Sequence, residues 1–551
     1  METGDTGTRG DGPAPARSRW APMPFIALGV SLIIMDATIV NVAVPTIIGD
    51  LSLDASQAEW INSVYPLSLA ALLILFGRMG DLLGRRRLFI AGLLLFGASS
   101  LIATLAGSGG VLIAGRLLQG VGAAMILPAT LATVNASYTG RDRGVAFAIW
   151  GSTIGGMAAV GPLAGGWLTT DLSWRWAFLL NLPVILVVIA GTVRYVPETT
   201  DPHATRGADV PGALASVIGL GALVFALIEG ERFGWWRTSP HARFGDWQWP
   251  WAVSPTPVAL VVSAVALTLL VIDGRARARA GRPVLLDLSL FRIRGFRYGS
   301  IAALVVALGE FGLLFALPLC LQGALGYSAL GTGVLILALA VGTFLSSGTT
   351  ARFTRRYGAR AVVRAGLAIE AVAVAGLRVC AGAEMTSWTI AGWLFLYGAG
   401  VGLATAQLTS VILDDVPVEK SGQASGMQST VRQVGSALGI ASLGTMLIVL
   451  LGTGTTDRLA RTPGLTGQQR AAVSTAVRES AGAIIPTLAA RPGGQAIRVA
   501  ATAAMVDATR VVLFCAAGVL ALGLLATFAL PCGAAIRPAV EEVGSEELTG
   551  A

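Results

Sequence analysis

Separate stretches of about 20 apolar residues recur along this 551-residue chain and constrain its fold more than any other feature. A helix of that length is what crosses the hydrocarbon core of a bilayer. Fourteen stretches are found, near residues 21–48, 60–76, 88–107, 110–137, 145–168, 176–196, 210–229, 253–272, 298–322, 330–350, 361–380, 388–413, 433–452 and 505–530. With 54% hydrophobic and 13% charged residues, the chain is also more apolar than a soluble protein of this length. The sequence predicts an all-α polytopic membrane protein with 14 transmembrane helices.

Basic residues gather on one side of the predicted helices and give an expected orientation. Three arginines at 85–87 follow the second stretch, and seven arginines lie within 275–297. The short connections without Lys or Arg all fall on the other side, near 49–59, 108–110 and 323–329. Because cytoplasmic loops carry an excess of Lys and Arg, both termini are expected to be cytoplasmic and the protein to lie in the plasma membrane. The net charge of +8 then reflects these loops and anionic lipid headgroups, and no nucleic-acid partner is expected.

The sequence contains no pattern typical of an enzyme or a metal site. Its four cysteines lie in or beside the apolar stretches without metal-ligand spacing, and its two histidines lie in predicted loops. HExxH and GxSxG motifs are absent, as is a phosphate-binding P-loop that would indicate ATP as an energy source. We therefore expect no catalytic activity, no metal and no cofactor.

An internal repeat divides the chain into two similar parts. An offset of 274 residues aligns Gly161 with Gly435, Gly165 with Gly439, Gly84 with Gly358 and Arg86 with Arg360. The predicted organisation is an N-terminal six-helix half over 1–200 and a two-helix insert with a basic linker over 201–296. A C-terminal six-helix half follows over 297–551 and includes a long outer loop at 453–504. Two halves with a site between them near the midplane are the architecture of alternating-access transporters.

The segment GSTIGGMAAVGPLAGGWL combines glycine and proline inside one apolar stretch. Gly151 and Gly155, and likewise Gly161 and Gly165, are one helical turn apart, so another helix can approach backbone to backbone. Pro162 removes a backbone donor and kinks a helix. The pattern predicts close packing with hinge-like sliding, and a tightly packed helix pair without moving parts is the alternative.

Five motifs occur in order along the first half of the chain. They are DATIVNVAVPTI (36–47), GRMGDLLGRRR (77–87), RLLQGVGAA (116–124), the glycine- and proline-rich segment (151–168) and WRWAFLLNLPV (174–184). Together they resemble the major facilitator superfamily, and within it the fourteen-helix drug:proton antiporters. The resemblance implies a major facilitator fold with two six-helix halves and two inserted helices. Gly151, Gly155, Gly161, Pro162 and Gly165 match its antiporter motif, which implies export coupled to inward proton movement.

Charged residues inside apolar stretches are the candidate sites for proton coupling and substrate binding. An arginine such as Arg116 costs roughly 2.5–3.5 kcal/mol within a membrane helix and should face the bundle interior with a partner. Asp36 lies on a helix that runs the other way, so the two are expected to pair or to share a water network; a static buried pair is the alternative. The resemblance implies proton transfer for Arg116 and makes Asp36 a candidate coupling site.

Two further acids lie within the second half. Glu310 is about 20 Å along its predicted helix by helical rise, near the midplane, where it can serve as a proton site or bind a cationic substrate. A lone buried acid that is kept neutral is the alternative. Glu370 is the weaker candidate, because its helix is expected to be peripheral.

The loop between the second and third predicted helices has a different expected role. Gly77 and Gly84 allow helices to cross closely, and Asp81 can cap or bridge to a neighbouring helix end. The resemblance implies that this motif, with Arg85 and Arg86, latches the outward-open state on the cytoplasmic side. Positive-inside charge alone is the alternative, but it does not explain an aspartate among glycines.

These features favour a proton-coupled antiporter that exports small amphipathic or lipophilic compounds, such as drugs, antibiotics and dyes, across the plasma membrane. The proton gradient is the expected energy source. The expected partners are a small-molecule substrate, protons and the lipid bilayer, and we expect the chain to function as a monomer. The alternatives are a dedicated exporter of one natural product or lipid, and a transporter-like sensor that binds a ligand without moving it.

Overall fold

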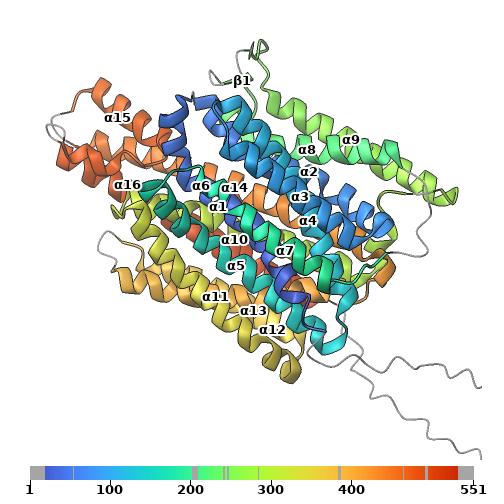
Figure 1. Ribbon diagram of the computed structural model, residues 1–551. Helices are drawn as coiled ribbons and strands as arrows, with labels where there is room; N and C mark the ends of the chain where they lie inside the picture. Colours follow the sequence, from blue (N-terminus) through green and yellow to red (C-terminus); the bar gives the residue numbers. More distant parts are fainter. Residues whose placement is uncertain are drawn as a thin grey trace, which may run out of the picture.

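The computed structural model describes residues 19–530, apart from residues 54, 201–208, 240–241, 245–246, 283, 383–385, 463–464 and 491–493. Within these residues the chain forms a bundle of long helices that run roughly along one axis (Figure 1). The first seven helices are α1 (Met23–Leu51), α2 (Ala55–Leu83), α3 (Arg85–Thr104), α4 (Gly109–Ser137), α5 (Gly140–Asp171), α6 (Trp176–Leu179) and α7 (Asn181–Tyr195). We refer to them as the first half.

An inserted pair of helices and the second half follow. The insert consists of α8 (Val210–Phe233), the strands β1 (Arg243–Phe244) and β2 (Trp247–Gln248), and α9 (Pro255–Arg279). The second half contains α10 (Arg294–Gly323), α11 (Ala329–Tyr357), α12 (Ala359–Cys380), α13 (Ser387–Leu413), α14 (Ser421–Ala460), α15 (Gly467–Glu479) and α16 (Gly494–Ala526). Short 3-10 turns are η1 (Leu288–Arg292), η2 (Val418–Lys420), η3 (Ile485–Ala490) and η4 (Thr527–Ala529).

In the described part of the chain, 12 helices are long and apolar enough to cross a membrane, so this is a multi-pass membrane protein. The predicted count of fourteen is therefore not confirmed. The stretches 145–168 and 361–380 form the long helices α5 and α12, which are not among the 12 helices that are both long and apolar enough to cross a membrane. On α12, Arg360, Arg364 and Arg378 interrupt the apolar sequence.

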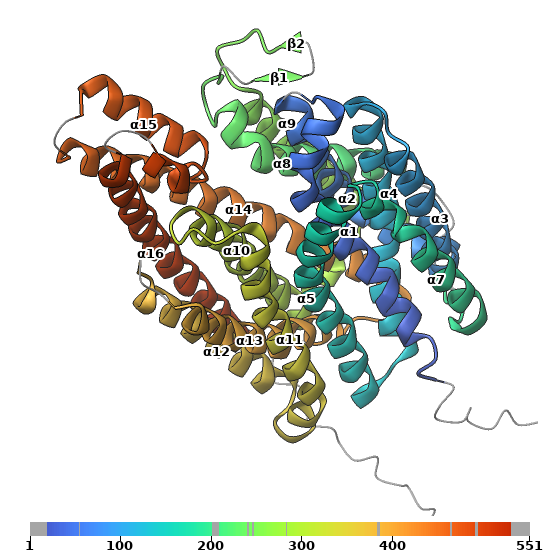
Figure 2. The same ribbon diagram turned by 60° about the vertical axis from the view of Figure 1, so that its left-hand side comes forward.

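Successive long helices run in opposite directions, so their connections lie at two ends of the bundle. We call the end at which α1 begins and α16 ends the terminal end, and the opposite one the far end. The β1–β2 hairpin and α15 lie at the far end (Figure 2). Which end faces the cytoplasm stays a prediction.

The two halves repeat the same helix packing. In the first half α5 packs along α1, and in the second half α14 packs along α10. A Cβ atom at Gly165 would lie 3.0 Å from the backbone oxygen of Ile39, and one at Gly439, which the 274-residue offset aligns with Gly165, would meet the backbone oxygen of Leu308. Small residues permit this close approach of membrane helices. The aligned glycines thus both pack on the backbone of the first helix of their own half, whereas the predicted domain boundaries stay a prediction.

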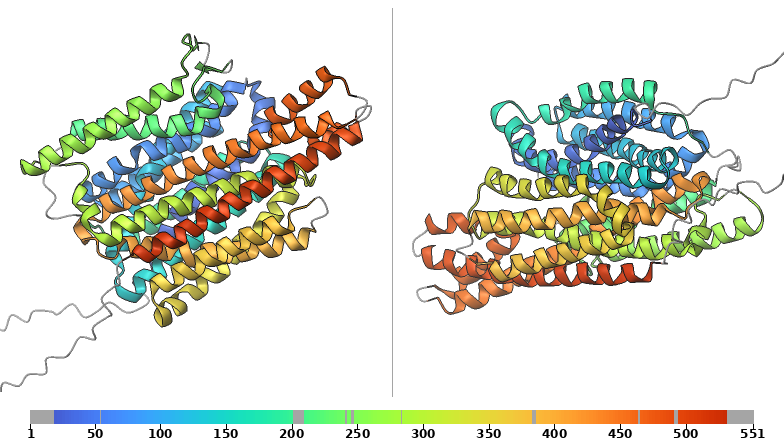
Figure 3. Two further views of the ribbon diagram at one scale, coloured as in Figure 1. Left: turned by 180° about the vertical axis from the view of Figure 1, so that it is seen from behind. Right: turned by 90° about the horizontal axis from the view of Figure 1, so that it is seen from below.

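The halves meet along two sides, and the inserted helices lie at one of them. On one side α2 packs against α14, and α8 contacts both of these helices; on the other, α5 packs against α11 and α13. α9 packs on α8 at the edge of the bundle (Figure 3). Its side chains Val261, Leu269 and Ile272 are 63%, 55% and 59% exposed, as expected for a helix that faces lipid.

The second half extends well beyond the predicted spans at the far end. α14 has 40 residues and is about 60 Å long, roughly twice the thickness of the hydrocarbon core. It runs along the whole bundle (Figure 3). α15 packs on it, with the Ser474 hydroxyl 3.2 Å from the backbone oxygen of Gly452 and 2.6 Å from the Thr456 hydroxyl. The predicted outer loop at 453–504 is therefore largely helical in its described residues.

Candidate functional site

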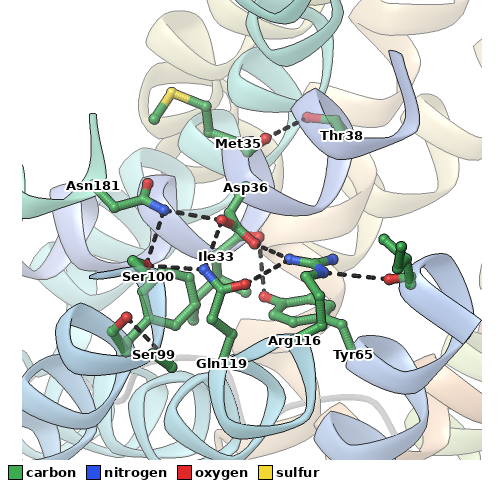
Figure 4. A network of polar contacts seen from close by, with 12 residues as sticks. Ile33, Met35, Asp36, Thr38, Tyr65, Ser99, Ser100, Arg116, Gln119 and Asn181 are labelled. Carbon is green, nitrogen blue, oxygen red and sulfur yellow. Dashed lines mark hydrogen bonds and ion pairs between the residues drawn. The ribbon is translucent and has the colours of Figure 1, made fainter. Parts of the chain in front are cut away.

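Asp36 and Arg116 form a buried ion pair inside the first half (Figure 4). Asp36 comes from α1 and Arg116 from α4, and each residue is 1% exposed. The Arg116 guanidinium also donates from Nη1 to Gln119 Oε1 at 2.9 Å and from Nε to the backbone oxygen of Ile61 at 3.4 Å. Of the two arrangements that the sequence left open, direct pairing is the one observed.

Amide and hydroxyl side chains complete the surroundings of Asp36. Gln119 Nε2 and Asn181 Nδ2 both donate to Asp36 Oδ1, at 3.0 and 2.9 Å. The same two amides donate to the Ser100 hydroxyl at 2.9 and 3.2 Å. Gln119, Asn181 and Ser100 are all fully buried. Sequence reasoning missed them, although an isolated amide within an apolar stretch is the signal that could have found them.

Tyr65 of α2 covers the ion pair from a further side. The Arg116 guanidinium carbon lies 4.4 Å from the centre of the Tyr65 ring, in a cation–π contact. The Tyr65 hydroxyl donates to the backbone oxygen of Ile33 at 3.1 Å. Asp36, Arg116 and Tyr65 thus bring α1, α4 and α2 together at one buried point.

Glu310 occupies the matching position in the second half, because the 274-residue offset that aligns the glycines also leads from residue 36 to residue 310. It is 3% exposed on α10. Its Oε2 lies 3.2 Å from Nη2 of Arg432 on α14, and its Oε1 accepts a hydrogen bond of 3.0 Å from Thr405 on α13. Each half therefore contains a buried carboxylate with an arginine partner. Over the described residues, no three His, Cys, Asp or Glu side chains gather in a way that could hold a metal ion.

Asp81 connects the halves at the terminal end. Its two carboxylate oxygens accept hydrogen bonds from the backbone N–H groups of Gly422 and Gln423, at 2.8 and 2.9 Å. Arg85 Nη2 donates to Asp81 Oδ1 at 2.7 Å, and both side chains are buried. A carboxylate is stabilised at the N-terminus of a helix. The expected bridge to a neighbouring helix end thus runs from α2 in the first half to α14 in the second.

The other residues of the predicted latch have separate structural roles. A Cβ at Gly77 would lie 2.6 Å from the backbone oxygen of Gly422, so α2 and α14 touch backbone to backbone. Gly84 has a φ of 109°, which disfavours a side chain, and a Cβ there would lie 2.6 Å from Glu198. The Arg86 backbone N–H donates to Glu198 Oε1 at 3.0 Å. Arg86 therefore ties α3 to the segment after α7 and does not join the two halves.

Further polar contacts join the halves at the terminal end. They are the Arg143–Asp414 ion pair, the hydrogen bond of 2.8 Å from Asn135 to Ser421, and the hydrogen bond of 3.1 Å from Gln407 to the backbone oxygen of Gly144. The two halves are therefore held together at this end in the present conformation.

The glycine- and proline-rich motif places α5 against α1. Gly161 packs on Thr38 and Gly165 on Ile39, directly after the carboxylate of α1. The remaining members of the motif are Gly151, which is half-buried, and Gly155 and Pro162, which lie outside the described side chains. The other side of α5 packs against α11 and α13. α5 thus lies between the buried ion pair of the first half and the second half.

Two similar membrane-embedded helical halves, each with a buried ion pair, define a transporter of the alternating-access class. The sequence model of the Major Facilitator Superfamily matches residues 26–440, and the chain belongs to this family. It is 32% identical to the "Probable actinorhodin transporter" of Streptomyces coelicolor, over 80% of this chain and 75% of that protein. It is 35% identical to the "Puromycin resistance protein pur8" of Streptomyces alboniger, over 79% and 82%.

Two more similarities agree with this assignment. The chain is 30% identical to the "Multidrug efflux pump LfrA" of Mycolicibacterium smegmatis, over 81% of this chain and 84% of that protein. The crystal structure of the human organic anion transporter MFSD10 (TETRAN) shares the fold, with a TM-score of 0.58, 13% identity and coverage of 93% of this chain and 100% of that one. The predicted major facilitator fold is thereby confirmed.

Proposed function

We propose that this protein is a proton-coupled antiporter that exports small amphipathic or lipophilic compounds across the plasma membrane and catalyses no reaction. The observation that carries the proposal is the pair of buried carboxylates, Asp36 and Glu310, at repeat-related positions in the two halves. Each is balanced by an arginine, so each can change its charge state when that arginine moves. The names of the relatives, which refer to antibiotic transport, drug resistance and efflux, support export as the direction.

Asp36 is the proposed proton-coupling residue of the first half. When a proton neutralises it, Arg116 loses its carboxylate partner and the two amides lose a charged acceptor. Charged hydrogen bonds are the stronger ones, so this change loosens the contacts among α1, α4 and α7. α1 packs on α5, and α5 packs on the second half. Protonation at Asp36 can therefore reach the interface between the halves through α5.

Glu310 is the proposed site for a cationic substrate or a second proton. Arg432 balances the charge of Glu310. Because the side chain of Arg432 is 20% exposed, it can turn away from Glu310 without becoming buried elsewhere. A substrate cation that binds Glu310 takes the place of Arg432. Competition between arginine and substrate for one carboxylate makes binding responsive to the charge of the cargo.

The terminal end is the proposed cytoplasmic end, and Asp81 is its latch. The hydrogen bonds from α14 to Asp81 hold the halves together there. This arrangement corresponds to a state closed toward the cytoplasm. Rocking of the halves would break these contacts and re-form them once in each transport cycle.

A dedicated exporter of one natural product is the second candidate. It is favoured by relatives that are named for single compounds, namely actinorhodin and puromycin. This candidate keeps the same fold, proton site and latch, and it differs only in the breadth of the cargo.

Transport by reconstituted protein tests the proposal. Proteoliposomes with a pH-sensitive dye inside are given ethidium, a lipophilic cation, under an imposed proton gradient. We expect proton flux that depends on substrate. Asp36→Asn should abolish this flux, and Glu310→Gln should abolish the flux that ethidium drives. Asp457→Asn is the matched control, because Asp457 is exposed on the far-end part of α14. Wild-type flux in both Asp36→Asn and Glu310→Gln would disprove these roles, and no flux with any cation would favour the dedicated exporter or a sensor.

A further inference from the structure

The linker that follows the inserted helices is tied to the start of α8 by a buried aspartate. Asp209 directly precedes α8, and its Oδ1 caps the helix by accepting a hydrogen bond of 2.9 Å from the backbone N–H of Gly212. Its Oδ2 accepts a hydrogen bond of 2.9 Å from the backbone N–H of Leu285. Leu285 is buried in the linker between α9 and η1. A side chain at the beginning of the insert therefore holds the backbone that leaves its end.

Arg277, near the end of α9, pairs with the same carboxylate. Its Nε lies 3.4 Å from Asp209 Oδ1 and 2.6 Å from Oδ2 of Asp273, which is four residues earlier on α9. A buried charge is costly unless it is paired and hydrogen-bonded, so these contacts stabilise the carboxylate of Asp209. The start of α8, the end of α9 and the linker at Leu285 therefore meet at one side chain.

Two residues further along, the linker is bound to the second half. The backbone N–H of Asp287 donates to Gln423 Oε1 at 3.0 Å, and Lys420 Nζ lies 2.5 Å from Asp287 Oδ2. Lys420 directly precedes α14, and Gln423 lies in its first turn. Phe291 of η1 then packs edge-on against Phe296 of α10, with the ring centres 5.5 Å apart. From Asp287 onward the linker therefore belongs to the second half.

The connection between these two attachments is very short, and we call residues 285–287 the strap. An extended chain spans at most about 3.6 Å per residue, so the attachments at Leu285 and Asp287 can lie no more than about 7 Å apart. α8 packs on both α2 and α14, at the side where the two halves meet. If α8 stays on α2 when α14 moves away from it, the strap is too short to follow, and one of its attachments has to break.

Gln423 connects the strap directly to the latch at Asp81. Its backbone N–H donates to Asp81 Oδ2 at 2.9 Å, while its side-chain oxygen accepts the hydrogen bond from the backbone of Asp287. Gln423 is buried, so both bonds are shielded from water. The first turn of α14 is therefore held at one residue by α2 and by the strap, through different atoms.

We propose that the strap is a second closure of the terminal end, which holds the first turn of α14 against Asp81 and detaches from Asp209 when the halves separate. The attachment at Asp209 is the one that breaks, because the strap has one hydrogen bond there, whereas Asp287 has both a hydrogen bond and an ion pair to the start of α14. The inserted helices thereby take part in gating. The inference rests on the proposed latch and is independent of proton coupling and of the cargo.

Hydrogen–deuterium exchange of the full chain in lipid nanodiscs tests this coupling without any need for transport. Asp209→Asn keeps an oxygen that can cap α8, but it loses the charge and the second acceptor. We expect amide exchange to become about tenfold faster, as for loss of a hydrogen bond to a charged group, both in the peptide that holds 284–290 and in the one that holds 421–425. Asp273→Asn is the matched control, because Asp273 pairs with the same arginine within α9, and both peptides should keep their wild-type rates.

Two further variants keep the test decisive if Asp209→Asn does not fold. Asp287→Asn weakens the other attachment of the strap and should speed exchange in the 421–425 peptide. Because coupling between two sites is reciprocal, Asp81→Asn should in turn speed exchange in the 284–290 peptide. Faster exchange in Asp209→Asn that is confined to 284–290, or unchanged exchange in both peptides, would overturn the proposal. An unchanged 284–290 peptide in Asp81→Asn would also refute it, because the insert would then move together with α14. Proton flux is not measured here, so failure of the antiport proposal leaves these outcomes readable.

Discussion

Replacing Asp81 by asparagine is expected to release the two halves from each other at the terminal end. Asp81 accepts hydrogen bonds from Gly422 and Gln423 at the first turn of α14, and from Arg85 on its own side. An asparagine has nearly the same shape but only one acceptor oxygen and no charge. The change therefore removes one contact between the halves and leaves Arg85 buried without its carboxylate.

The size of the effect follows from the lost interactions. A hydrogen bond to a charged group contributes about 1.5–3 kcal/mol, and a charge at a helix N-terminus contributes a further ~0.3–2 kcal/mol. A combined loss of about 3 kcal/mol changes the equilibrium between joined and separated terminal ends by roughly a hundredfold. A joined state that is favoured about 99 to 1 would then be close to equally populated with the separated state.

Distance measurements between spin labels can detect this shift. Labels are attached at Arg87→Cys in the first half and Tyr357→Cys in the second, because the side chains of both residues are largely exposed at the terminal end. The native cysteines are first replaced by serine. We expect one population of distances in the wild type and an additional, longer one in Asp81→Asn. Asp142→Asn is the control, because Asp142 pairs with Arg19 at 3.0 Å within the first half.

Two results would refute this reasoning about the latch. One is a distance distribution in Asp81→Asn that matches the wild type although the protein is folded. The other is an equal shift in Asp142→Asn, which would show that any lost negative charge at this end has the same effect.

Two further predictions concern packing and acid stability. Gly165→Ala should destabilise the α1–α5 contact by about 1–3 kcal/mol and slow ethidium efflux from cells, because the new Cβ meets the backbone of Ile39 at 3.0 Å. Gly156→Ala is the control and should have neither effect, because its Cβ would meet nothing within 4 Å. Equal effects of both would contradict the packing argument. At Asp287, burial is the largest single influence and raises the pKa, but the hydrogen bonds from Lys420 and Ser289 and the charge of Lys420 together outweigh it and lower the pKa. Its contribution to stability is present above the unfolded pKa of about 3.9 and is lost as pH falls through the lower folded pKa. Asp287→Asn should therefore lower the thermal unfolding midpoint at pH 7 but much less at pH 3; equal losses would count against the ion pair.

The positions of the helices were predictable from the sequence, but their ends were less so. Thirteen of the fourteen apolar stretches fall on one helix each and the stretch 176–196 covers α6 and α7, because a run of about 20 apolar residues has few other stable arrangements in a membrane. The start of α14 was placed too late, at residue 433 instead of Ser421. Its first turns are rich in small and polar residues, such as Gln423 and Gln428, and these are buried against neighbouring helices and the other half. A reading based on hydropathy assigns such a segment to a loop.

The partners of the charged residues were harder to predict than the residues themselves. The opposite directions of their helices led to the expectation that Asp36 and Arg116 pair or share water, and the two do pair. Arg432 was missed because it lies just before the apolar stretch predicted at 433–452. Asn181 was missed because an apolar helix does not reveal which side faces a partner. Glu370 shows the same limit, since its helix lies at the periphery while its side chain points inward. The roles of these residues in transport stay predictions.

The length of α14 connects events on the two sides of the membrane mechanically. Its first turn is tied to Asp81 at the terminal end, and its last turns carry α15 at the far end. If this continuous helix of 40 residues tilts as one rigid body, a tilt that separates its first turn from Asp81 also displaces α15. The position of α15 is thus expected to change when the contacts of Asp81, about 60 Å away along α14, break or re-form.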